Sequence, residues 1–425
     1  MKVGIVSAYP ERGQHHSEAS GAEAFIKNVA QCLDGECERV VFANRLEDHD
    51  HEYTEDGMLI KRSWDRTLLY PLQIFFAVKD ENPDVIHIQH EYNSLYGGPL
   101  NVLLFPLLLF MLRLTGQKIV CHPHQIITDP AVLSSEMVNS KLLYLPNQVL
   151  SFLFLMYNQS IVSLSHRVIA WENHFKSDLE DKCLVDDDEV VVIPHGVESP
   201  RSDQKSQTPP MRSDGGDLTK SIDGSALIDD SNSRVALYFG FISYYKGPDL
   251  LADCLGSLPE DWNVIFAGGK HPYLKEDPNY LSFYESVERK VAGNENACLT
   301  GFVDEEDIVR YFSAADVVIL PYRLLMSGSG ILPLALKHRT PFLISAPLSP
   351  IFQTSDFQKY LNNCDMLDES DLVFSSDLED LDEKLANLSG DLYAEAEELS
   401  DQLKASRSWN ALSDEYMDIY HQVSA

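Results

Sequence analysis

A lysine and a loop of small residues in the second half of the chain have the types and spacing to bind an anion. In GFISYYKGPD (240–249), Gly240 permits close backbone approach after an expected strand. Lys246 supplies a compact cation just before an expected helix, with a surface lysine in a turn as the alternative interpretation. A small-residue loop later opens an apolar run of helical spacing, so its amide groups could hold a phosphate. This loop consists of Ser327, Gly328, Ser329 and Gly330.

Histidines follow three expected strands of the first half. They lie in HIQHEY (87–92), CHPHQ (121–125) and VIPHGV (192–197). A metal site would need several closely spaced ligands, and neither CxxC nor HExxH is present. Contacts with an anionic or hydroxylated ligand are therefore favoured, with hydrogen-bonded loop histidines as the alternative. In VIPHGV a hinge turn at Gly196, with His195 incidental, is a second interpretation.

The loop PERGQHHSEASGA (10–22) joins the first expected strand to the first helix. Ser20 and Glu23 have the spacing of a capping box, and Gly21 would let a phosphate approach the backbone amides. The absence of G-x-G-x-x-G disfavours a nicotinamide cofactor. The DHD at 48–50 resembles a metal-binding Asp-x-Asp, but it lies in an acidic run and is interpreted as chance.

The elements that position these residues alternate between apolar strands and helices in both halves of the chain. This pattern predicts an α/β protein with two doubly wound domains facing a cleft. We expect an N-terminal domain (1–198), a polar linker or insertion (199–233) and a C-terminal domain (234–405). A last helix (406–425) could pack back on the first domain.

The overall composition limits the function. With 66 acidic residues against 33 basic ones among 425, the net charge of −33 disfavours nucleic acid as a partner. It suits a halophile's surface, with an acidic cytosolic protein as the alternative. Seven cysteines without CxxC spacing indicate a reducing compartment, and the N-terminus begins with a strand rather than a signal peptide.

Two segments are unusually apolar, residues 99–116 and 142–157. Neither reaches the length of a membrane-spanning helix. They fit buried helices, or a patch that docks on a bilayer or a lipid-linked acceptor. The two interpretations are compatible if only one face of each helix is buried.

Taken in order, the motifs resemble those of family-4 glycosyltransferases, which are retaining enzymes of the GT-B fold. The similarity extends to haloarchaeal hexosyltransferases of surface-glycan biosynthesis, and it covers most of the chain outside the linker. The segments that carry it are SGAEAF, IQHEY, VIPHGV, GFISYYKGPDLL, IFAGG, LTGFVDEEDIVRYFSAADVVILPY and SGSGILPLALKHRTP.

The resemblance implies metal-independent transfer of a sugar from a nucleotide-sugar, with no cofactor. Lys246 would contact the donor diphosphate, with amides of the SGSG loop and the close approach of Gly21. His124 would lie near the sugar and the acceptor as the catalytic-site histidine. We also assign Gly240, His195 and Gly196 to donor binding, and His90 and Glu91 to the acceptor side.

The sequence departs from the family at three positions. Two glutamates usually lie eight residues apart around the small-residue loop, and here the register gives Ser327 and Ala335, or Met326 and Leu334. Phe241 replaces an arginine. We expect Arg323 to supply that charge, and Ser327 and Ser329 to bind sugar hydroxyls.

The expected function is transfer of a hexose to a growing glycan. The acceptor would be a polyprenyl (dolichol) phosphate-linked oligosaccharide for surface glycoproteins, or a polysaccharide. The reaction would take place in the cytoplasm at the inner face of the cell membrane. Alternatives are a catalytically silent protein that binds a nucleotide-sugar or scaffolds a partner, and another GT-B enzyme such as an epimerase or a phosphorylase.

Overall fold

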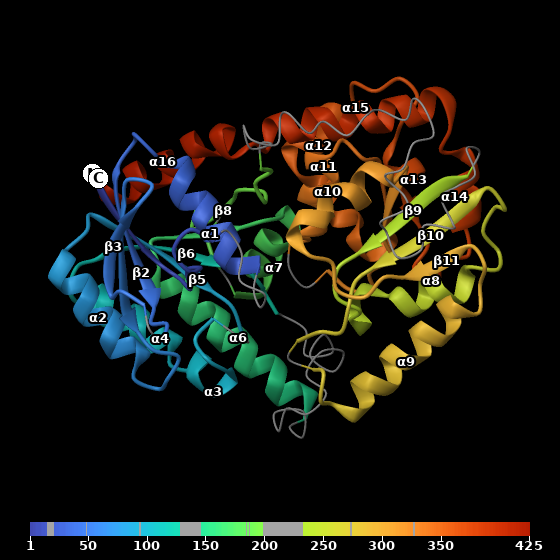
Figure 1. Cartoon of the computed structure of the whole chain (residues 1–425). Helices are drawn as coiled ribbons and strands as arrows, with labels where there is room; N and C mark the ends of the chain where they lie inside the picture. Colours follow the sequence, from blue (N-terminus) through green and yellow to red (C-terminus); the bar gives the residue numbers. More distant parts are fainter. Residues whose placement is uncertain are drawn as a thin grey trace.

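A computed structural model shows how these elements are arranged (Figure 1). It describes most of the chain, including both expected domains. The described residues are 1–14, 21–47, 49–92, 95–127, 146–183, 185–186, 188–198, 233–272, 274–325 and 328–425. The expected capping residue Ser20, and the linker apart from Ser233, lie outside them.

The described residues of the first domain form an eight-stranded sheet in the order β3-β4-β2-β1-β5-β6-β7-β8. All neighbours are parallel except β3 and β4, which form an antiparallel hairpin at the edge. The strands are β1 (Lys2–Val6), β2 (Glu38–Asn44), β3 (Glu52–Glu55), β4 (Met58–Trp64), β5 (Val85–His90), β6 (Lys118–Pro123), β7 (Arg167–Ala170) and β8 (Val190–Val192).

Helices cover both faces of this sheet, as buried parallel strands require. One face packs against α2 (Tyr70–Glu81), α4 (Phe105–Leu114), α6 (Asn147–Leu164) and α7 (Asn173–Cys183), with the short α3 (Pro99–Val102) before α4. The other face packs against α1 (Gly21–Cys32) and the last helix of the chain, α16 (Trp409–Ser424).

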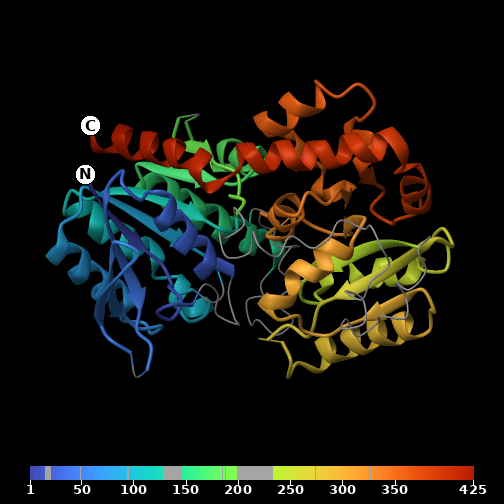
Figure 2. The same ribbon diagram turned by 45° about the horizontal axis from the view of Figure 1, so that its top comes forward.

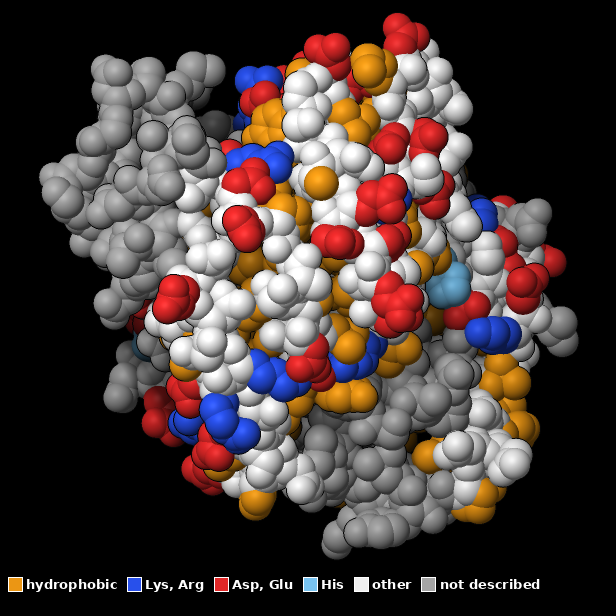
Figure 3. All heavy atoms as spheres, turned by 90° about the vertical axis from the view of Figure 1, so that its right-hand side faces the viewer, with side chains coloured by type: hydrophobic (Ala, Val, Ile, Leu, Met, Phe, Trp, Pro, Cys, Tyr) orange, Lys and Arg blue, Asp and Glu red, His pale blue; other side chains and the backbone are white. Residues whose placement is uncertain are grey.

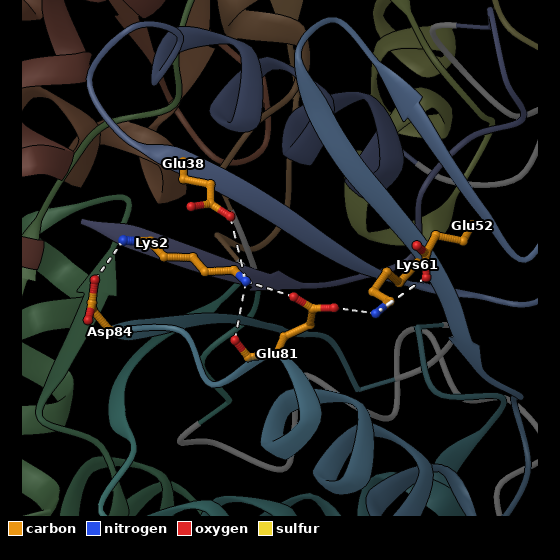
Figure 4. A network of polar contacts seen from close by, with 6 residues as sticks. All are labelled: Lys2, Glu38, Glu52, Lys61, Glu81 and Asp84. Atoms are coloured by element: carbon orange, nitrogen blue, oxygen red, sulfur yellow. Dashed lines mark hydrogen bonds and ion pairs between the residues drawn. The ribbon is translucent and has the colours of Figure 1, made fainter.

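An ion-pair network fastens the amino-terminal edge of the first sheet (Figure 4). Glu81, at the end of α2, bonds Lys2 of β1 with an Oε2–Nζ distance of 2.7 Å and also bonds Lys61 of β4. The hydrogen bond from Lys2 holds the pKa of the Glu81 carboxyl below its ordinary value. Lys2 is the first residue of β1, so the network stabilises the sheet on the side opposite to the carboxyl ends of the strands.

The second domain repeats the topology with six parallel strands among its described residues, in the order β11-β10-β9-β12-β13-β14. The strands are β9 (Arg234–Phe239), β10 (Trp262–Ala267), β11 (Ala297–Leu299), β12 (Val317–Leu320), β13 (Phe342–Ser345) and β14 (Val373–Phe374). The helices are α8 (Pro248–Cys254), α9 (Pro278–Ala292), α10 (Glu305–Ala314), α11 (Ile331–Lys337), α12 (Ser355–Leu361), α13 (Glu369–Leu372), α14 (Leu381–Asn387) and α15 (Gly390–Ser406), with single 3-10 segments η4 (Tyr244–Lys246) and η5 (Ala346–Gln353).

The end of the chain joins the two domains. Helices α15 and α16 run across both, and the two termini lie close together (Figure 2). Between the helices, buried Arg407 bonds Asp356 of the second domain, and its carbonyl accepts from the amide of Val197 at 2.7 Å. The buried side chains of α16 recur every three or four residues, which gives it the apolar stripe that packs on the first sheet.

The predicted α/β architecture of two doubly wound domains is confirmed. The β3–β4 hairpin was not predicted, because EYTEDGMLIKRSW contains many charged residues and does not give a continuous apolar run. Within the described part of the chain, no helix combines the length and hydrophobicity needed to cross a membrane.

Candidate functional site

The strand order identifies where a ligand would sit in each domain. In the first sheet the order reverses between β1 and β5, and in the second between β9 and β12. Ligands of doubly wound proteins bind beyond the carboxyl ends of strands at such reversal points. Gly240 follows β9, Tyr322 follows β12, and Glu91 follows β5, so these loops outline the candidate site.

Backbone geometry places Lys246 over Gly240. Lys246 ends the single turn of η4, and the next residue, Gly247, has φ +65° and no space for a Cβ, which would lie 1.9 Å from the carbonyl oxygen of Pro321. The chain therefore doubles back, and Lys246 Nζ comes within 2.8 Å of the position that a Cβ on Gly240 would occupy. A side chain at position 240 would overlap the ammonium group, so glycine is needed there for Lys246 to take this position.

Polar and aromatic groups surround this lysine. Its Nζ lies 5.9 Å from the ring centroid of Tyr322, whose hydroxyl is 3.4 Å from Ser329 Oγ. Ser329 Oγ also accepts from the amide of Ile331 at 3.3 Å. Burial, helped by the charge of Lys246, lowers the pKa of His271 to about 4. A neutral imidazole and a cation beside small residues make an environment suited to an anion.

The small-residue loop meets the first domain at Trp171. A Cβ on Gly328 would lie 2.3 Å from Trp171 Cε3, so only glycine lets the loop pass this ring. Gly330 is exposed and has open space at its Cβ position. Met326 and Ser327 lie outside the described residues. Gly328 and Trp171 thus bring the strand ends of the two domains into contact.

His124 lies beside the same tryptophan. The two ring centroids are 4.8 Å apart, and Phe25 of α1 packs on His124 at 5.2 Å. The side chain is 7% exposed, and its Nε2 is 2.5 Å from Gln89 Oε1. Burial lowers the pKa of His124 to about 3, so the ring is neutral at physiological pH.

His195 and Gly196 complete the first-domain side. His195 is partly buried between Phe25 and Trp171, and burial lowers its pKa to about 4. A Cβ on Gly196 would lie 2.5 Å from Trp409 of α16, so this glycine is required by packing at the domain junction. Gly196 does not have the positive φ that the hinge-turn interpretation of VIPHGV requires, so its need for glycine comes from packing.

The structure argues against the expected role of Arg323. Its guanidinium makes two bonds of 2.7 Å to the carboxylate of Asp249 and donates to the carbonyl of Tyr244 at 2.8 Å. The charge is therefore compensated within the protein, which disfavours the expected replacement of the missing arginine. Phe241, at that position, packs on His271 with ring centroids 5.3 Å apart.

His90 also departs from the expectation. It is fully buried, its Nε2 is 2.7 Å from the hydroxyl of Tyr157, and Phe105 packs on it at 4.5 Å. Its side chain therefore belongs to the core below α4 and α6, which disfavours the expected acceptor-side role. Glu91 is partly buried at the end of β5, and Gly21 is the first residue of α1.

The family's two glutamates are absent from this chain. At the two matched positions that the structure describes, 334 and 335, the side chains are apolar. Ala335 is fully buried in the core of the second domain, and Leu334 packs partly buried against that core. In the described part of the chain, no cluster of three His, Cys, Asp or Glu side chains could hold a metal ion. The four residues around the site that sequence reasoning missed are Gln89, Trp171, His271 and Tyr322.

Of these, Gln89 and Tyr322 stand inside motifs that were singled out, IQHEY and VVILPY, and their place in those motifs was the available signal. Trp171 and His271 follow expected strands, and polar or aromatic residues at strand ends could have been flagged by that rule alone. Only the fold shows that Trp171 meets a loop more than 150 residues away.

Comparison with known proteins agrees with this arrangement. Residues 19–201 match the family described as Glycosyltransferase Family 4, and residues 225–350 match Glycosyl transferases group 1. A D-inositol 3-phosphate glycosyltransferase of Xylanimonas cellulosilytica is 26% identical over 163 residues. That match covers 38% of this chain and only 36% of the relative's own length.

Solved structures share the whole architecture. Sucrose-phosphate synthase from Thermosynechococcus elongatus superposes with a TM-score of 0.66 at 14% identity, covering 99% of this chain and 98% of that one. Anabaena HepE in complex with UDP gives a TM-score of 0.63 at 13% identity, covering 99% and 100%. The same Anabaena protein has also been solved with UDP-glucose. At these identities the likeness concerns the fold.

Proposed function

Since the chain belongs to the glycosyltransferases of the GT-B fold, with a family 4 region followed by a group 1 region, we propose that it transfers a hexose from a nucleotide-sugar to a growing glycan. The observation that carries the proposal is the placement of Lys246 over Gly240, beside Ser329 and Tyr322. A leaving nucleoside diphosphate gains negative charge, and a positioned cation stabilises it.

We propose that this transfer needs no metal and no protein carboxylate as base. Lys246 supplies the positive charge next to the expected diphosphate, and the neutral His124 supplies a polar contact for a sugar hydroxyl. The binding of UDP and UDP-glucose by the structurally similar Anabaena protein supports a nucleotide-sugar as donor. The calorimetric titration described below identifies which nucleotide this chain binds.

For the acceptor, we propose a polyprenyl phosphate-linked glycan at the inner face of the cell membrane, in surface-glycoprotein synthesis. Support comes from one apolar face of the first domain, formed by neighbouring helices α2, α4 and α6. Its exposed side chains are Leu68, Leu69, Leu72, Phe76, Leu100, Leu103, Leu107, Phe110, Leu114, Val149, Phe152, Leu153 and Met156.

The charge distribution supports the same acceptor. Residues 99–116 contain one charged residue, Arg113, and residues 146–165 contain none, in a chain with 99 acidic and basic residues (66 + 33). Leu100 is 73% exposed and Phe152 59% exposed, so these are not core positions. A contiguous apolar surface of this kind suits a bilayer, into which exposed leucine and phenylalanine side chains can insert.

The donor is tested by calorimetric titration in molar salt without divalent metal, using UDP, GDP, ADP and dTDP separately. Binding of one nucleotide is expected, followed by hexose transfer from its sugar conjugate to a polyprenyl phosphate-linked acceptor. Nucleotide binding without transfer to any lipid-linked or soluble glycan would favour a silent binding protein. Failure of the folded chain to bind any nucleotide would refute the donor site.

The acceptor side is tested by flotation of the full chain with liposomes that contain a polyprenyl phosphate. Phe110→Ser combined with Phe152→Ser should abolish flotation, whereas Met366→Ser should not. Met366 is 57% exposed and lies on the second domain, so it matches the size and exposure of the altered residues. Unchanged flotation of the double variant would exclude the apolar face as the membrane contact.

A further inference from the structure

A chain of buried hydrogen bonds runs from the C-terminal helix to His124. Nε2 of His124 lies 2.5 Å from Oε1 of Gln89, and Nε2 of Gln89 lies 3.0 Å from Nε2 of His87. Nδ1 of His87 then lies 2.8 Å from the hydroxyl of Tyr420 on α16. Four side chains from β5, α16 and the end of β6 are thereby connected in series.

All four side chains are shielded from water. His87, Gln89 and Tyr420 are fully buried, and His124 is 7% exposed. His87 and Gln89 are two residues apart on β5, so their side chains point to the same face of the sheet, where α16 packs. With water excluded, each polar atom depends on its partner in the series, which gives every hydrogen bond a defined direction.

The direction follows from the orientation of the Gln89 amide, whose oxygen faces His124 and whose nitrogen faces His87. Burial lowers the pKa values of His87 and His124 to about 3, so each neutral ring carries one proton. The amide oxygen of Gln89 can only accept, which puts the proton of His124 on Nε2. The amide nitrogen of Gln89 donates to Nε2 of His87, which puts the proton of His87 on Nδ1, where it is donated to Tyr420.

We propose that Gln89, His87 and Tyr420 are positioning residues that hold His124 in its Nε2–H tautomer, so that Nδ1 accepts a hydrogen bond from a hydroxyl of the bound hexose. The assignment of this hydroxyl to a hexose rests on the proposed function, whereas the tautomer of His124 does not. The last helix of the chain, which packs on the first sheet, therefore takes part in setting the hydrogen-bonding character of a site residue in the first domain.

The test is nitrogen-15 NMR of the full chain with labelled histidine, with the His124 signals assigned from a His124→Gln spectrum. The expected wild-type spectrum has the proton of His124 on Nε2. Gln89→Met, which keeps the side-chain length but removes the amide, should shift both ring-nitrogen signals of His124 toward a mixture of tautomers. The turnover number should fall about fivefold, the effect of one lost neutral hydrogen bond, with nucleotide affinity unchanged.

A matched pair on α16 separates positioning from packing. Tyr420→Phe removes the hydroxyl that accepts from His87, and should perturb the His87 and His124 signals. Tyr416→Phe removes an equally buried hydroxyl one helical turn away, which has no hydrogen-bond partner among the described residues, and should leave them unchanged. If Gln89→Met does not fold, this pair still decides the matter.

Two results would overturn the proposal. One is a wild-type proton on Nδ1 of His124, which would mean that the series runs in the opposite direction. The other is a His124 signal that is identical in wild type, Tyr420→Phe and Tyr416→Phe. Since the spectra need no substrate, an absence of nucleotide binding or transfer would refute the proposed function and leave the tautomer result standing.

Discussion

The two domains have the same doubly wound topology, yet the strand ends at which they meet are built from different side chains. On the first-domain side, Phe25, His124, Trp171 and His195 form a cluster of neutral rings. On the second-domain side, Lys246 lies over glycine beside hydroxyl groups. The scaffold fixes where ligands go, and the side chains at the strand ends decide which part of a nucleotide-sugar each domain can bind.

The outer surfaces differ in the same sense. Asp and Glu side chains are spread over the outer face of the second domain (Figure 3), whereas α2, α4 and α6 of the first domain expose leucine and phenylalanine. The second domain is thus solvated by charge, whereas α4 and α6 of the first domain contain Arg113 as their single charged residue. Four substitutions test the first contrast, between the strand ends of the two domains.

Lys246→Ala should have the largest effect. Without the ammonium group, the nucleotide that binds wild type should bind about 100-fold more weakly, the value of a strong charge-assisted contact. The control is Lys270→Ala, which removes an exposed lysine from the same domain. Calorimetry gives both affinities, and equal affinities would move the donor site away from Gly240.

Gly328→Ala tests the contact that joins the two sides. Its Cβ would overlap Trp171, so the small-residue loop must shift, and an overpacking cost of roughly 2 kcal/mol would lower kcat/KM about 30-fold. Gly330→Ala is the matched control in the same loop, with open space and a helical φ of −66°. Equal activity of the two variants would show that the loop does not close on Trp171 in the reacting state.

Sequence reasoning predicted the fold well because alternating apolar strands and helices report a local property, the burial of each element. It also singled out Lys246 and Gly240, which the structure brings together through a short turn. It did not reveal that Arg323 and His90 are bonded to Asp249 and Tyr157, which lie 74 and 67 residues away. Contacts of that kind depend on how elements pack, and no periodicity in one sequence reveals them.

Glu172→Gln probes the junction where the neutral side meets the charges of the second domain. Glu172 is 4% exposed, and burial raises the pKa of its carboxyl to about 8, against the effect of Arg407 and with that of Asp356. The folded state therefore keeps a proton that the unfolded state releases, so this group lowers stability as pH rises from about 4.5 through 8.

The glutamine variant lacks this proton linkage. It should be close to wild type at pH 5 and more stable at pH 9 by roughly 4 kcal/mol, measured by denaturant unfolding in constant molar salt. Glu295→Gln, at an exposed position, should show no such difference. Parallel pH profiles for wild type and Glu172→Gln would mean that the buried carboxyl ionises freely at this junction.

Arg323→Ala should have the smallest effect on the donor, less than about twofold in nucleotide affinity, because the guanidinium is already paired with Asp249. Asp249→Asn removes the other partner of the same ion pair. The two substitutions should lower the stability of the folded protein by similar amounts. If Arg323→Ala instead weakened nucleotide binding as strongly as Lys246→Ala while Asp249→Asn did not, the guanidinium would have to leave its carboxylate for the donor. Lys246 and Arg323 would then both supply positive charge to the donor. The second-domain side of the site would differ in charge from the neutral rings of the first domain by two cations instead of one.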